Sequence, residues 1–154
     1  EENSGKLVTI VRKQASRIAA ERNLNMVIID GPPGIGCPVI ASVGGTSLVL
    51  VVTEPTVSGL HDMDRVLQLA AHFKSPAMVC INKCDLNRTM ADEVGKLAAR
   101  RGVRVAGEVP YDPTVTRAQI AGQSVVELSS EGAAQAIRRL WETARTELES
   151  LPHG

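Results

Sequence analysis

The stretch Ala77–Asp85, AMVCINKCD, decides the fold that the sequence predicts. Its first five residues are all apolar, and such a run is typical of a parallel strand that is covered on both faces. Asn82, Lys83 and Asp85 follow at once, so polar side chains stand where the strand ends. Because ligands of open parallel sheets bind beyond the carboxyl ends of the strands, the stretch predicts a buried strand that leads into a candidate binding loop.

Three further segments have the same apolar pattern and predict strands at Met26–Ile29, Ser47–Thr53 and Val103–Val109. Between and around them, capping residues and apolar residues at helical spacing predict helices over residues 4–22, 38–43, 56–73, 87–101, 114–121 and 131–148. Strand and helix alternate, which predicts a three-layer α/β fold with a mostly parallel sheet and helices on both faces. The chain length predicts a single domain, residues 1–154.

The composition is that of a soluble globular protein, with 44% apolar residues, 22% charged residues and no net charge. We therefore expect no nucleic-acid partner. No apolar run approaches the ~20 residues that span a bilayer, and we expect a cytoplasmic protein without a membrane span. The three cysteines are dispersed, which argues against a disulfide framework, and they cannot form a metal site alone.

Asp30 follows the first predicted strand and is itself followed by Gly31-Pro32-Pro33-Gly34. Phosphate-transfer enzymes use an aspartate at the end of a strand to hold Mg²⁺, usually through water. Gly34 keeps its N–H and has no side chain, so a terminal phosphate can approach it closely. Asp30 and Gly34 are thus candidate catalytic residues, with Asp30 as the metal residue. The alternative is that Asp30 only caps the turn.

Two more loops at strand ends are candidates for nucleotide binding. Asn82-Lys83-Cys84-Asp85 resembles the N-K-x-D element of GTP-binding proteins, in which the Asn supports the base loop, the Lys stem covers the base and the Asp accepts from guanine. The Pro110-Tyr111-Asp112 loop follows the last predicted strand and could present backbone groups to a base edge. For both loops the alternative is an ordinary turn.

Three motifs together resemble the MinD and ParA superfamily of P-loop ATPases with a deviant phosphate loop. They are D-G-P-P-G-I-G-C-P-V-I-A-S from Asp30, V-T-E-P-T-x-S-G-x-H-D from Val52, and I-N-K-C-D-L-N from Ile81. The resemblance extends from Asn3 to about Val126 and is strongest to the MinD-like subgroup that carries an inserted ferredoxin domain.

The resemblance implies roles for the residues at the strand ends. It implies that Asp30 holds the Mg²⁺ water and that Gly34 faces the γ-phosphate. It also implies that Asn82 contacts adenine, and that Pro110–Asp112 flanks adenine. Glu54-Pro55-Thr56 matches the segment that opens a helix beside the nucleotide, at a dimer interface of the family.

The chain departs from this family in two ways. The Lys-Gly-Gly-x-Gly-Lys-[Thr/Ser] phosphate loop is missing, and so are the eight cysteines that would hold two iron–sulfur clusters in the ferredoxin insert. We therefore expect this chain to be the C-terminal half of an ATPase, beginning after the insert. The intact protein would bind Mg²⁺ and ATP, whereas this chain alone would bind no cofactor and be inactive. A homodimer or oligomer is expected, with an iron–sulfur or redox protein as a further partner.

The missing phosphate loop includes a strand that, by the resemblance, lies between Met26–Ile29 and Ser47–Thr53. Burying three aliphatic side chains is worth roughly 5–9 kcal/mol, so we expect these two strands to pair directly or another copy of the chain to fill the gap. Two other functions stay open on the sequence. One is a GTPase that uses Asn82–Asp85, and the other is a non-catalytic α/β scaffold that binds a partner protein through its exposed edge.

Overall fold

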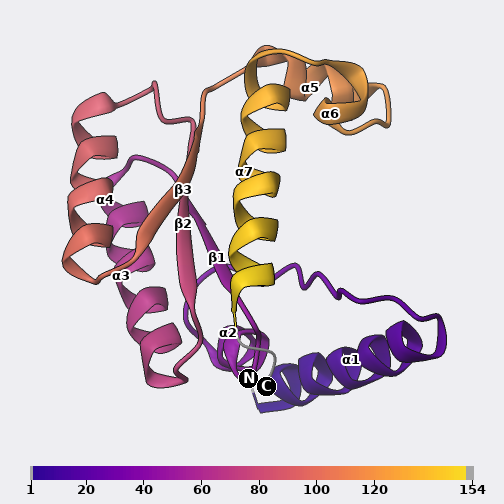
Figure 1. Ribbon diagram of the computed structural model, residues 1–154. Helices are drawn as coiled ribbons and strands as arrows, with labels where there is room; N and C mark the ends of the chain where they lie inside the picture. The colour runs from indigo at the N-terminus through magenta and orange to yellow at the C-terminus, as the bar shows by residue number, and fades with distance from the viewer. Residues whose placement is uncertain (1, 152–154) are drawn as a thin grey trace.

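The computed structural model describes residues 2–151 and has the predicted α/β architecture (Figure 1). One parallel sheet has the strand order β1-β2-β3, with β1 at Val49–Thr53, β2 at Ala77–Asn82 and β3 at Arg104–Val109. Helices α3 (Val57–His72) and α4 (Arg88–Arg100) cover one face, and α7 (Gly132–Ser150) lies on the other. The predicted three-layer fold is confirmed. That residues 1–154 form one domain stays a prediction, and residues 1 and 152–154 lie outside the described part.

Four further helices complete the described chain: α1 (Glu2–Glu21), α2 (Cys37–Val43), α5 (Pro113–Ile120) and α6 (Val125–Leu128). The helix α6 was not predicted, whereas the other helices lie close to their predicted ranges. In Figure 1, α5 and α6 lie at the opposite end of the molecule from α1 and α2. Within residues 2–151, no helix combines the length and the apolar character needed to cross a bilayer.

The core follows from the alternation of side chains along the strands. Val51, Val79 and Ile81 point to the α3/α4 face, where they pack against apolar residues of both helices: Met63, Leu67, Ala91, Val94 and Ala98. On the other face, Cys80 and Val109 pack against α7, which contributes Ala133 and the half-buried Ala136, Ile137 and Leu140. Both faces of β2 are covered. This explains why its sequence is a continuous apolar run without alternation.

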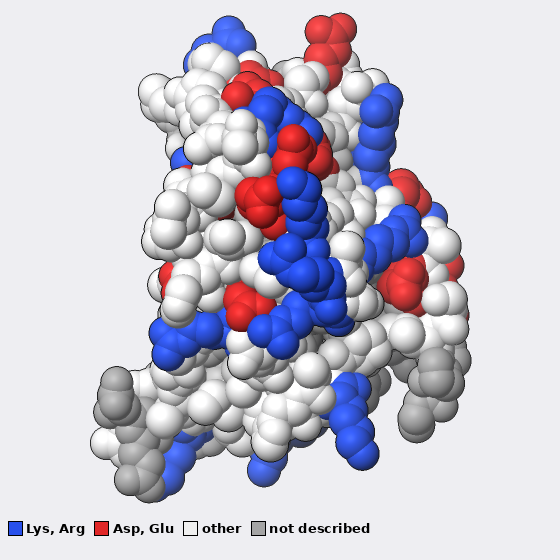
Figure 2. All heavy atoms as spheres, turned by 90° about the vertical axis from the view of Figure 1, so that its left-hand side faces the viewer, with Lys and Arg blue, Asp and Glu red and all other residues white. Residues whose placement is uncertain are grey.

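The outer surface of α3 and α4 is charged with both signs. Figure 2 shows basic and acidic side chains interleaved on this side of the molecule. Several form ion pairs, including Arg101 with Asp64 at 2.7 Å and Lys96 with Glu93 at 2.7 Å. The interleaving of the two signs is typical of a solvated helix face.

The prediction of a strand at Met26–Ile29 is wrong. These residues form neither helix nor strand, and Ile28 is 76% exposed. The expected direct pairing of this segment with residues 47–53 is also wrong, because β1 pairs with β2 alone within the described residues. An apolar segment becomes a strand only where a neighbouring strand completes its backbone hydrogen bonds, and Met26–Ile29 has no such neighbour here.

Helix α1 packs on α2. Gly5 of this helix lies against Cys37 at the start of α2. Arg12 Nη1 donates to Ala41 O and, at 2.8 Å, to Gly44 O, so it caps the C-terminal end of α2. The larger apolar side chains of α1 stay exposed: Leu7, Ile10, Val11 and Ile18. The predicted apolar stripe of this helix is therefore largely uncovered.

Candidate functional site

The candidate site lies at the carboxyl end of the sheet. Because the three strands are parallel, the segments that follow them, Glu54–Thr56, Asn82–Asp85 and Pro110–Asp112, leave the sheet at the same edge. In Figure 1 this edge points toward α5. All three segments were predicted as site residues, and the structure brings them together through side-chain contacts.

An ion pair joins the ends of β1 and β2. Lys83 Nζ lies 2.7 Å from Glu54 Oε1, and both side chains are about half exposed. Lys83 has a φ of +52°, a left-handed conformation that is uncommon for a non-glycine residue. An exposed pair of this kind contributes about 0–1 kcal/mol, so its effect is on side-chain position more than on stability. The pair keeps the Lys83 ammonium over the end of β1.

Two hydrogen bonds join the ends of β2 and β3. Asp85 Oδ1 accepts from the backbone N–H of Tyr111 at 2.7 Å, and the backbone N–H of Cys84 donates to Val109 O at 3.1 Å. The resemblance to the N-K-x-D element assigned Asp85 to a guanine base, but here one carboxylate oxygen is used to hold the neighbouring loop. Tyr111 itself remains half exposed beside this bond.

Asn82 ends β2 in the middle of the cluster. Its Oδ1 accepts from the backbone N–H of Lys83 at 3.1 Å, which fixes the orientation of the amide. Within residues 3–151, Nδ2 donates to no acceptor. A half-buried amide donor at the carboxyl end of a central strand can bind an acceptor on a planar base. This geometry fits the contact with adenine that the resemblance implies.

Asp112 fastens three elements at the end of β3. Its Oδ1 accepts from Thr114 N at 2.8 Å and caps α5, and its Oδ2 accepts from Ala133 N at 3.0 Å at the start of α7. Gly132 has a φ of +56°, and a Cβ there would lie 2.4 Å from Asp112 Oδ2. The Asp112 side chain is therefore engaged in the fold and is not available to a ligand.

The stabilising effect of Asp112 should disappear in acid. Hydrogen bonds from the Thr114 hydroxyl and from the backbone N–H groups of Thr114 and Ala133 lower the pKa of Asp112 from its ordinary value. A lowered pKa adds stability above the unfolded pKa of about 3.9, and that stability is lost as pH falls through the folded pKa.

Asp112→Asn keeps a capping oxygen but carries no charge. The difference in Tm between wild type and this variant should be greatest near neutral pH and should decrease as pH falls through the folded pKa. A difference that is constant over the whole pH range would contradict the assignment.

The Glu54-Pro55-Thr56 segment turns the chain from β1 into α3. Pro55 is buried, and Thr56 Oγ1 accepts from Gly59 N at 2.9 Å as the N-cap of α3. Thr53 Oγ1 donates to Gly59 O at 2.9 Å. The segment is rigid for these reasons, and the Glu54 carboxylate projects from it toward Lys83.

Asp30 and Gly34 are not brought to this edge of the sheet. Asp30 is exposed in the unpaired segment between α1 and α2. Gly34 has a φ of +88°, and a Cβ there would meet no atom within 4 Å. The described residues contain no group of three or more His, Cys, Asp or Glu that could hold a metal ion. The roles of Asp30 and Gly34 therefore stay predictions.

The three cysteines differ in their surroundings. Cys37 is exposed, whereas Cys80 and Cys84 are buried. Burial raises the pKa of the Cys80 thiol to about 11, so it remains protonated at neutral pH. Cys80 and Cys84 therefore act as small buried packing residues, whereas Cys37 does not.

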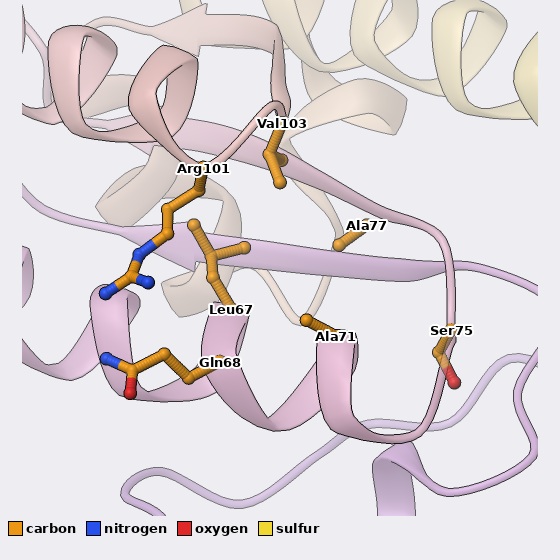
Figure 3. A pocket seen from close by; sticks show the side chains of 7 residues that line it. All are labelled: Leu67, Gln68, Ala71, Ser75, Ala77, Arg101 and Val103. Carbon is orange, nitrogen blue, oxygen red and sulfur yellow. The ribbon is translucent and has the colours of Figure 1, made fainter.

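A pocket of about 240 Å³ lies at the opposite, amino end of the strands (Figure 3). It is bounded by the last turns of α3, by Ala77 at the start of β2 and by Arg101 after α4. The Arg101 guanidinium forms two hydrogen bonds to Asp64, at 2.7 and 2.8 Å, so its charge is already paired. This pocket is separate from the predicted site, and none of its residues was predicted to bind a ligand.

No protein-family model matches the chain. A curated relative, the iron–sulfur cluster carrier protein of Pyrococcus furiosus, is 28% identical over 96% of this chain and 54% of its own length. Among solved structures, the MinC:MinD cell division protein complex of Aquifex aeolicus superimposes with a TM-score of 0.73 and 23% identity, over 96% of this chain and 61% of that one. The cell division ATPase MinD of P. furiosus superimposes with a TM-score of 0.68 and 20% identity, over 81% of this chain and 53% of that one.

The relatives and structural neighbours are MinD- and ParA-type P-loop ATPases. The resemblance seen in the three sequence motifs is thereby confirmed, and so is the P-loop NTPase-like fold. The chain spans about half the length of the curated relatives it matches, 46% to 54% for the first of them. The comparisons therefore show a MinD/ParA-type fold for this chain. Any activity of the whole protein is a proposal.

Proposed function

We propose that this chain forms the base side of the nucleotide site of a MinD/ParA-type ATPase. The observation that supports it most is the cluster at the carboxyl end of the sheet. Two side-chain contacts join its three loops, Glu54 with Lys83 and Asp85 with Tyr111, and Asp112 joins the last loop to Ala133 of α7. In open α/β sheets this edge is where ligands bind. The loops are held in place without a ligand, so the base would bind a surface that is already organised.

Individual roles follow from the contacts. Asn82 offers its Nδ2 to a ring nitrogen of adenine, and the loop Pro110–Asp112 lies along the base with its backbone. Lys83, held by Glu54, lies at the rim of the base site, where it can approach either the ribose or a second subunit. The Asp85 carboxylate holds the Pro110–Asp112 loop through the backbone N–H of Tyr111. Its bond to the Tyr111 amide favours ATP over the GTP alternative, because one carboxylate oxygen already has a donor and fewer acceptor sites remain for the N–H groups of guanine.

The phosphate side of the site needs residues from outside this chain. Phosphate binding in P-loop proteins depends on the amides and the lysine of the phosphate loop together with Mg²⁺, and the sequence has no such loop. The described residues do not fit a metal ion as they stand, since Asp30 belongs to no group of three or more His, Cys, Asp or Glu among them. We therefore assign no step to Mg²⁺ here, and Asp30 and Gly34 are proposed to join the phosphate side only when that polypeptide is bound.

Calorimetry with Mg-ATP tests this division of the site. The isolated chain should show no micromolar binding, because base contacts alone do not replace those to the phosphates. Co-expression with the part of the P. furiosus relative that this chain does not cover should restore binding, and Asn82→Ala should weaken it. Micromolar affinity of the isolated chain would contradict the proposal.

The link to iron–sulfur chemistry is supported by the function named for the P. furiosus relative. The donor set of this chain does not fit a cluster, because two of its three thiols are buried and no metal-binding group occurs among the described residues. We propose that any cluster is held by another segment or by a partner protein. The ATPase would then couple nucleotide hydrolysis to the handling of that cluster.

A further inference from the structure

One carboxylate caps two helices at the end of β3. Asp112 Oδ1 accepts from the backbone N–H of Thr114 in the first turn of α5, and Asp112 Oδ2 accepts from the backbone N–H of Ala133 in the first turn of α7. Glu131, which directly precedes α7, makes no side-chain capping bond within the described part of the chain. Asp112 therefore caps α7 from 21 positions earlier in the sequence.

Gly132 leaves the space that this carboxylate occupies. Its φ is +56°, a left-handed conformation that glycine adopts without steric cost. A Cβ at this position would also collide with Asp112 Oδ2. Any larger residue at 132 must therefore displace the carboxylate or shift the start of α7. The position requires glycine for two separate reasons, and only one of them is its backbone conformation.

The helix α7 also packs along β3 itself (Figure 1). A Cβ at Gly107, inside β3, would meet Leu140 Cδ1 at 3.3 Å, so this helix lies close to the backbone of the strand. Cys80 and Val109 of the sheet belong to the same apolar cluster as Ala133 in the first turn of α7. The helix is thus fixed on the sheet, and its first turn holds the loop that follows β3.

We propose that Gly132 is a positioning residue for the nucleotide base, an inference that rests on the proposed function. Gly132 contacts no nucleotide itself. It allows the Asp112 carboxylate to join α5 to α7, and this fixes the backbone of Pro110–Asp112. Asp85 holds the same loop from the other side, through the backbone N–H of Tyr111. A loop that is fixed in advance loses less conformational entropy when the base binds.

Titration of the full chain with millimolar ATP, followed by the backbone amide signals of Asn82 and Lys83, tests this role. Gly132→Ala should raise the dissociation constant for ATP by about threefold or more, because the loop is no longer organised. The Ala133 amide signal should move even without ATP, since its bond to Asp112 is lost. A residue that served stability alone would leave the dissociation constant of the folded chain unchanged, and far-UV circular dichroism shows that each variant is folded.

Gly122→Ala is the matched control. Gly122 also has a left-handed φ, +67°, but a Cβ there meets no atom within 4 Å. The variant therefore introduces the same kind of backbone strain without contact to Asp112. Its dissociation constant for ATP should equal that of wild type.

A double-mutant cycle with Asp112→Ala tests whether the effect of Gly132 passes through the carboxylate. Asp112→Ala alone should weaken ATP binding at least as much as Gly132→Ala. Once the carboxylate is removed, a Cβ at position 132 has no carboxylate to displace, so Gly132→Ala should weaken binding no further. Asp112→Asn leaves Gly132 unchanged and offers one acceptor oxygen to two N–H groups, so it should also weaken binding.

Three results would overturn this inference while the proposed function stands. They are an unchanged dissociation constant in Gly132→Ala, an equal loss of affinity in Gly122→Ala, and additive losses in the double mutant. The second would assign the effect to backbone strain, and the third would separate Gly132 from the carboxylate. A wild-type chain without ATP-induced shifts at residues 82–85 and 110–112 would instead overturn the proposed function and this inference together.

Discussion

Replacing Gly59 by alanine is expected to destabilise the protein by about 3 kcal/mol, the upper part of the usual range for overpacking. A Cβ at this position would lie 2.4 Å from Glu54 O and 2.9 Å from Thr53 Oγ1. The nearest atom belongs to the backbone, so the clash can be relieved only by moving the turn between β1 and α3. The change should therefore also disturb the Glu54–Lys83 ion pair, and equilibrium urea unfolding measures the loss of stability.

Gly95→Ala is the matched control for this variant. Gly95 lies inside α4, and a Cβ there meets no atom within 4 Å. Alanine in a helix interior is favoured over glycine by roughly 0.5–1 kcal/mol, so this variant should be slightly more stable than wild type. If Gly59→Ala were as stable as Gly95→Ala, the close packing of the β1–α3 turn would be refuted.

Met63→Ala should cost about 2–5 kcal/mol, the range for removing a large buried aliphatic side chain. Met63 is 1% exposed and lies in the cluster between the sheet and α3/α4, where Val51, Val79 and Ile81 pack. The substitution leaves a cavity beneath β1 and β2, next to the strands whose ends form the candidate site. Thermal unfolding followed by circular dichroism should show a much lower Tm.

Val57→Ala on the same helix is the control for Met63→Ala. Val57 is 74% exposed at the start of α3, so its truncation removes little buried surface. Exposed substitutions of this type usually change stability by less than about 0.5 kcal/mol. Equal losses for the two variants would mean that α3 does not pack on the sheet through Met63.

Strands that have a neighbouring strand could be predicted from the sequence, and the segment without one could not. The predictions at 47–53, 77–81 and 103–109 agree with β1, β2 and β3 to within two residues, because each apolar run is paired and packed in the structure. Met26–Ile29 has the same composition but no neighbouring strand. Local sequence indicates the capacity to form a strand, whereas pairing depends on which other segments are present.

The short helix α6 was missed although a local signal exists. Ser124 and Glu127 form a capping box, in which the Glu127 carboxylate accepts from Ser124 N at 2.8 Å. The S-x-x-E spacing that gives this contact can be found in the sequence. A helix of four residues has almost no periodicity, so the capping signal was the only one available.

The residue types of the candidate site were predictable, but the contacts between them were not. Strand ends in a parallel sheet lie together, and this rule predicts Asp30, Glu54, Asn82 and Pro110 at one edge. It fails for Asp30, because the segment before Asp30 joins no sheet. The bond from Tyr111 N to Asp85 joins residues 26 positions apart, and it depends on the register between β2 and β3. Sequence spacing carries no information on such a register, which includes an irregularity between Val79 and Cys80.

The most direct test of the base-side site is the mapping of ATP-induced chemical shifts in the isolated chain. Millimolar ATP should shift the backbone amide signals of residues 82–85 and 110–112, GTP should do so more weakly, and Asn82→Ala should remove the effect of ATP. The signals of the Arg101 pocket at the opposite end of the sheet should not change. Shifts confined to that pocket, or a response to ATP that is unaltered in Asn82→Ala, would contradict a base site at the carboxyl ends of these strands.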